Sequence, residues 1–145
     1  LSLRADLATL AAAPRFTADP GAVRYMARNV SFGGRLIRPM LAIHTTGDPL
    51  VPVQVQRAYA DAVRDAGRSA LLRQAYVHRG GHCAFTAGEI LAALRTLELR
   101  IRTGGWSGTD PAALNRLAAA LDPTAPPAYV TYRPAPYPRP FNLSH

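Results

Sequence analysis

The chain has 145 residues, room for one domain of ordinary size, and its 48% of hydrophobic and 18% of charged residues are typical of a soluble globular protein. All seventeen basic residues are arginines spread along the chain, so the net charge of +8 favours a solvated surface and no nucleic-acid partner. The single cysteine, Cys83, excludes an intrachain disulfide and a multi-cysteine zinc site, and no apolar run reaches the roughly 18 residues of a membrane-spanning helix.

Residues 1–35 predict a helical segment. Leucines at positions 3, 7 and 10 share one face of a helix over residues 2–13, which Pro14 ends. Asp19-Pro20 is a helix start, and the second helix runs to about Asn29. The chain begins with Leu, without an initiator Met or a leader, a start typical of a fragment or a processed chain. Both a cytoplasmic and a secreted location are compatible with it.

Residues 36–121 predict a βαβα unit. The apolar runs at 39–43 and 69–77 are expected to be strands, and helical spacing recurs over 53–66, 86–102 and 110–121. The helix between the strands is long enough for a parallel, right-handed crossover. Residues 122–145 hold seven of the thirteen prolines and are expected to lie extended over the surface.

Two residues that can carry acid–base chemistry follow the two predicted strands. Asp48 lies five residues beyond Ile43, and His82 lies five residues beyond Val77, after two glycines. Because functional groups of parallel sheets gather beyond the carboxyl ends of the strands, the two loops are expected to meet. The Asp48 carboxylate could then accept the Nδ1–H of His82 and fix the imidazole for proton transfer.

These residues resemble the C-terminal part of an α/β-hydrolase. Residues 39–52 are similar to that family's penultimate core strand and acid turn, and Gly81-His82-x-x-Phe85 with Glu89 is similar to its histidine loop. The interval of 34 residues between Asp48 and His82 also suits the family. The resemblance covers residues 36–102 and implies that Asp48 is the triad acid and His82 the general base. Residues 1–35 would then belong to a lid or cap.

The sequence departs from this family at the nucleophile. No G-x-S-x-G elbow precedes Asp48, and the oxyanion-hole loop is missing as well. Ser107, in Gly-Trp-Ser-Gly-Thr, follows His82 and lacks the final glycine, while Ser31 lacks the first. Neither serine is therefore expected to act, and the nucleophile is expected in a segment outside this chain.

Structural interpretations stand beside the catalytic ones. Asp48 is also a common turn or cap residue, and His82 could merely flank a helix. Of the remaining candidates, His44 is expected to be a core residue, and His78 competes only weakly with His82 for the role of the base. Cys83 is expected to be buried and not to face the ring of His82. Glu89 is expected to interact favourably with the helix dipole in the first turn of its helix.

The leading hypothesis is the C-terminal segment of a serine α/β-hydrolase that cleaves an ester or related acyl bond of a small molecule. Such hydrolysis needs no cofactor and no metal, but it needs a partner, the N-terminal hydrolase segment that carries the serine. A non-catalytic α/β-hydrolase-like interaction module is the alternative, and an arginine-driven nucleic-acid binder is a third.

Overall fold

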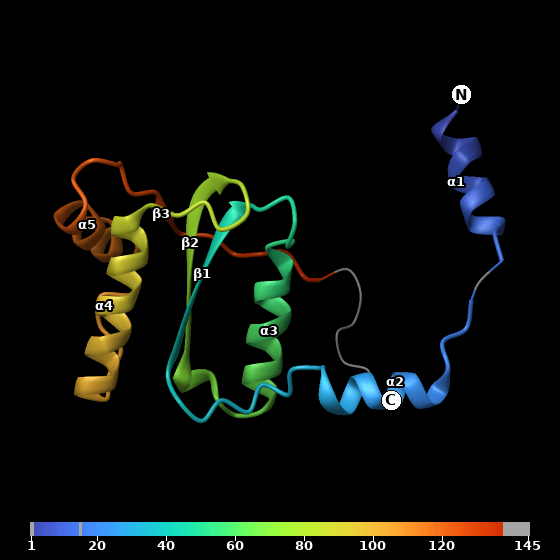
Figure 1. Ribbon diagram of the computed structural model, residues 1–145, viewed down its shortest axis with the longest axis horizontal. Helices are drawn as coiled ribbons and strands as arrows, with labels where there is room; N and C mark the ends of the chain where they lie inside the picture. Colours follow the sequence, from blue (N-terminus) through green and yellow to red (C-terminus); the bar gives the residue numbers. More distant parts are fainter. Residues whose placement is uncertain (1, 15, 138–145) are drawn as a thin grey trace. The chain divides into compact units, whose positions relative to one another are not determined.

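The computed structural model describes residues 2–14 and 16–137, and it divides the chain between Ser31 and Phe32 into two compact units. The first unit holds α1 (Leu3–Ala12) and α2 (Pro20–Asn29), close to the predicted bounds (Figure 1). Asp19 caps α2, because its side chain accepts a hydrogen bond of 2.8 Å from the backbone N–H of Ala22. Neither helix contains a buried residue.

The second unit is a mixed α/β structure. Its elements in chain order are β1 (Met40–Gly47), α3 (Gln54–Asp65), a 3-10 turn (Ser69–Leu71), β2 (Leu72–Gly80), α4 (Ala87–Thr103), α5 (Pro111–Leu121) and β3 (Tyr129–Val130). Within this unit, α3 lies on one side of the sheet and α4 and α5 lie on the other (Figure 1). Of the helices in the described residues, none has the length and apolar character needed to cross a membrane.

The sheet has the order β1-β2-β3, and β1 pairs with β2 in parallel, as predicted. Both strands extend further toward the carboxyl end than predicted, to Gly47 instead of Ile43 and to Gly80 instead of Val77. The apolar runs stop earlier because the last residues of each strand are polar. The two strands nevertheless remain paired there, and Thr45 is buried beside its partner Val77.

The described part of residues 122–145 contains no helix and is extended in β3, as expected, but it does not lie only over the surface. Residues 138–145 lie outside the described part, but Tyr129 and Val130 pair antiparallel with Val77 and Tyr76, and Tyr129 is only 3% exposed. The proline content excludes a regular helix there, but the six residues between Pro127 and Pro134 leave room for the two-residue edge strand. Tyr129 thereby joins the core, which also contains Ala75, Val77 and Leu114.

Candidate active site

Asp48 lies directly after β1, in a turn that fixes its carboxylate. Its Oδ1 accepts hydrogen bonds from the backbone N–H groups of Leu50 at 2.8 Å and Val51 at 2.9 Å, and its side chain is 4% exposed. Burial would raise the pKa of this carboxyl, but the hydrogen bonds from Val51, His82 and Leu50 and the charge of His82 together lower it to about 2. Asp48 is therefore an ionised, oriented hydrogen-bond acceptor.

The ring of His82 lies against the other oxygen of this carboxylate. Nδ1 is 2.8 Å from Oδ2 of Asp48, which confirms that the two loops meet at hydrogen-bond distance. An ionised carboxylate can only accept, so Nδ1 carries a proton, and in the neutral form of the ring the lone pair is on Nε2. With the ring 44% exposed, the geometry allows Nε2 to take a proton from an incoming nucleophile while Asp48 stabilises the imidazolium that results.

The backbone just before His82 is tied to β1 on both of its polar groups. Gly81 donates its N–H to the carbonyl of Gly47 at 3.1 Å, and its carbonyl accepts the hydroxyl of buried Thr45 at 2.7 Å. The φ of Gly81 is 107°, a value that L side chains rarely adopt. A glycine is thus needed at position 81 for the conformation of the turn, as well as for the lack of side-chain bulk that the sequence indicated.

The expectation that Cys83 packs in the interior and does not face the ring is wrong. Cys83 is exposed, and its Sγ lies 3.6 Å from Nε2 of His82. Neighbouring side chains diverge in extended backbone, but Cys83 has a φ of 52°, in the left-handed region. This turn brings the side chain of Cys83 back over the ring of the residue before it.

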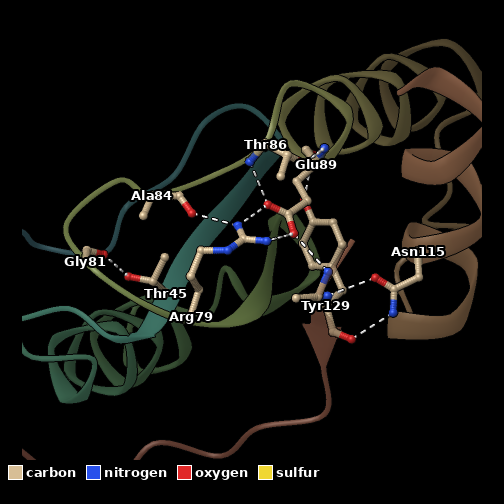
Figure 2. A network of polar contacts seen from close by, with 9 residues as sticks. Thr45, Arg79, Gly81, Ala84, Thr86, Glu89, Asn115 and Tyr129 are labelled. Carbon is tan, nitrogen blue, oxygen red and sulfur yellow. Dashed lines mark hydrogen bonds and ion pairs between the residues drawn. The ribbon is translucent and has the colours of Figure 1, made fainter. Parts of the chain in front are cut away.

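An ion pair that the sequence interpretation missed joins Arg79 of β2 to Glu89 of α4, the two elements that flank the histidine loop (Figure 2). Arg79 Nη1 and Nη2 donate to Oε2 and Oε1 of Glu89 at 2.6 and 3.0 Å. Glu89 is fully buried, so it is more than a residue that complements the helix dipole. Burial would raise the pKa of its carboxyl, but Arg79 and the N–H groups of Thr86 and Ala128 lower it, and Glu89 stays ionised. The Thr-x-x-Glu capping box at residues 86–89 was the signal in the sequence that could have drawn attention to it.

The described serines of the second unit lie at the wrong end of the sheet. Ser69 precedes β2, and Ser107 follows Trp106, whose Nε1–H donates to the carbonyl of Ala70 at 2.9 Å. His82 follows the opposite end of β2, a nine-residue strand about 30 Å long. A hydroxyl at the Ser107 end therefore cannot reach Nε2, which agrees with the expectation that Ser107 is not the nucleophile.

The other two described histidines are not part of this arrangement. His44 is buried, and its Nδ1 lies 2.7 Å from the carbonyl of Thr45, which confirms that it is a hydrogen-bonded core residue. The exposed ring of His78 contacts the hydroxyl of Thr46 at 3.4 Å. In the described ranges, no three His, Cys, Asp or Glu side chains are grouped so as to hold a metal ion.

A protein from Xanthobacter agilis named o-phthalyl amidase is 35% identical to the chain over 123 residues. The match takes in 83% of this chain but 27% of the relative, so the chain spans about a quarter of the length of the protein that it resembles. No protein-family model matches the chain, and no solved structure matches it.

Proposed function

We propose that this chain is the C-terminal segment of a serine α/β-hydrolase that cleaves an acyl bond of a small molecule, and that the bond is an amide. One observation carries the proposal: the ionised carboxylate of Asp48 contacts Nδ1 of His82 at 2.8 Å, so Nε2, which lies beside Sγ of Cys83, is the ring nitrogen that can act as a base. The similarity to an amidase supports hydrolysis as the reaction and an amide as the substrate, with an o-phthalyl acyl group as the first to test.

The proposed reaction begins outside this chain. His82 Nε2 takes the proton of a serine hydroxyl as the oxygen attacks the amide carbonyl, and His82 then gives that proton to the leaving amine. A water molecule, deprotonated by the same nitrogen, hydrolyses the acyl-enzyme. Asp48 keeps its negative charge throughout, orients the ring through Nδ1–H, and stabilises the imidazolium.

The sheet supports a partner segment that supplies the serine. Among the described residues β1 pairs only with β2, so its other edge has no strand partner. Exposed edge strands usually carry charges or proline against unwanted pairing, yet β1 (Met40–Gly47) contains no Arg, Asp, Glu or Pro. An edge of this kind suits a strand in the middle of a larger sheet, which the N-terminal hydrolase segment would complete.

The experiment compares the 145-residue chain with the longer protein in which the upstream segment is restored. The chain alone should not hydrolyse p-nitrophenyl acetate above the rate of free imidazole, because it lacks both the nucleophile and the oxyanion donors, and one such donor alone contributes about 3–4 kcal/mol. The longer protein should hydrolyse the ester and an o-phthalyl amide with a burst of acyl-enzyme formation. A burst from the short chain, or an inactive longer protein, would contradict the proposal.

A further inference from the structure

We propose that Arg79 and Glu89 are positioning residues that hold His82 in register with Asp48, and that the segment at Ala128 and Tyr129 locks this pair in place. The proposed reaction gives the arrangement its purpose, so the inference rests on the proposed function. Neither Arg79 nor Glu89 touches the ring of His82 in any contact described above. They act through the backbone of the loop that carries it (Figure 2).

The loop between β2 and α4 is held at its start, near its middle and at its end. Gly81 is bound to β1 at the start, as described above. Arg79 Nη1 donates to the carbonyl of Ala84 at 2.7 Å, and Glu89 Oε2 accepts the N–H of Thr86 at 2.8 Å. Two of the three attachments therefore depend on the ion pair, and His82 lies between the first and the second.

The guanidinium of Arg79 has a geometry that a simple cation could not replace. Its two terminal nitrogens contact both oxygens of Glu89 while Nη1 also reaches Ala84. The planar guanidinium thus links the end of β2 to the first turn of α4, the two elements on either side of the loop that carries His82. A lysine would keep the charge but could not keep all three contacts in this fixed plane.

The C-terminal segment completes the shell around Glu89. The N–H of Ala128 donates to Oε1 at 2.9 Å, and the hydroxyl of Tyr129 donates to the Glu89 carbonyl at 2.7 Å. Asn115 holds Tyr129 by two hydrogen bonds to its backbone, of 2.9 and 2.8 Å. Glu89 thus accepts four hydrogen bonds on its carboxylate, and the short strand β3 has a role beyond lengthening the sheet.

The test uses Glu89→Gln, Arg79→Lys, Arg79→Met and Tyr129→Phe, with Glu98→Gln as the matched control. Glu98 also lies on α4 and pairs with an arginine, Arg95, at 3.0 Å, but this pair is exposed. The first readout is the Nδ1 proton resonance and the tautomer of His82, measured by 15N NMR on the chain. The second is kcat and KM in the longer protein, and thermal unfolding is followed for every variant.

A shift of about 1 Å in a catalytic group lowers a rate about a hundredfold, so Glu89→Gln and Arg79→Met should lower kcat about ten- to a hundredfold, with KM changed less than about threefold. Both variants should also lower the intensity of the Nδ1 proton resonance of His82. Arg79→Lys should recover part of each loss, Tyr129→Phe should lose less, and Glu98→Gln should match the wild type.

Two results would overturn the inference. One is a set of folded Arg79 and Glu89 variants that keep the wild-type Nδ1 resonance. The other is loss of the fold in all of these variants, which would assign the pair to the fold as a whole. The NMR readout does not require hydrolysis, so an inactive longer protein would refute the proposed function and leave this inference to be decided by the resonance.

Discussion

Replacing Asp48 by Asn should reverse the tautomer of His82. The oxygen of the new side-chain amide can keep the two hydrogen bonds from Leu50 and Val51 only by turning its NH2 group toward the ring. That NH2 group donates to Nδ1, so the imidazole proton moves to Nε2. The opposite orientation would place the NH2 group against two N–H donors and lose both hydrogen bonds. The turn therefore selects the inactive tautomer.

In the longer protein, Asp48→Asn should lower kcat by as much as about 10⁴-fold, the size of the loss when a triad histidine is held in the wrong tautomer. KM should change little, because Asp48 contacts His82 and the turn rather than the substrate. Stopped-flow measurement of the acylation step isolates the effect, and 15N NMR of His82 on the same variant reports the tautomer. A variant with the protonated Nε2 and wild-type kcat would refute the reasoning.

Three further predictions address stability and access to the ring. Since folding lowers the pKa of Asp48 from 3.8 to about 2, its ionised form stabilises the fold above about pH 4, and this contribution is lost as the pH falls toward 2. As the pH is lowered over this range, the urea midpoint of Asp48→Asn should therefore fall less than that of the wild type. An equal fall in the urea midpoints of the two proteins would contradict this prediction. Leu114→Ala, at a core residue 1% exposed, should cost about 2–5 kcal/mol in urea unfolding, and Leu121→Ala, at 37% exposure, clearly less; equal losses would argue against this core. In the longer protein, the kcat of Cys83→Ala should stay within a few-fold of the wild-type value. Iodoacetamide should abolish the activity of the wild type but not that of Cys83→Ala, because an adduct on Sγ would block Nε2 of His82. Full activity after complete alkylation would contradict that geometry.

The sequence was sufficient to predict the parallel βαβ unit and the meeting of Asp48 with His82. Both depend on periodicity and on one general rule, that loops after parallel strands share an edge of the sheet. Chain order and strand length then place the two side chains close together. The helix bounds were predicted closely because their signals are local, such as Asp110 before Pro111, whose side chain accepts the N–H of Ala113 at 2.9 Å.

The features that were missed depend on contacts between distant residues or on a single backbone angle. Tyr129 enters the core because Asn115 binds its backbone, a pairing that no periodicity reveals. Glu89 can be buried because Arg79 neutralises its charge, whereas the sequence by itself suggests that both are charged surface residues. Cys83 lies against the ring of His82 because its φ is left-handed, which is uncommon for a residue other than glycine.

The proposed function requires Nε2 of His82 to be the general base for a serine outside this chain. The most direct measurement is the rate of o-phthalyl amide hydrolysis by the longer protein, with and without His82→Ala. Hydrolysis by the wild type and its nearly complete loss in His82→Ala, with the fold retained, are the expected results. A folded His82→Ala protein that hydrolyses the amide at the wild-type rate would contradict the claim and favour a non-catalytic role for this chain.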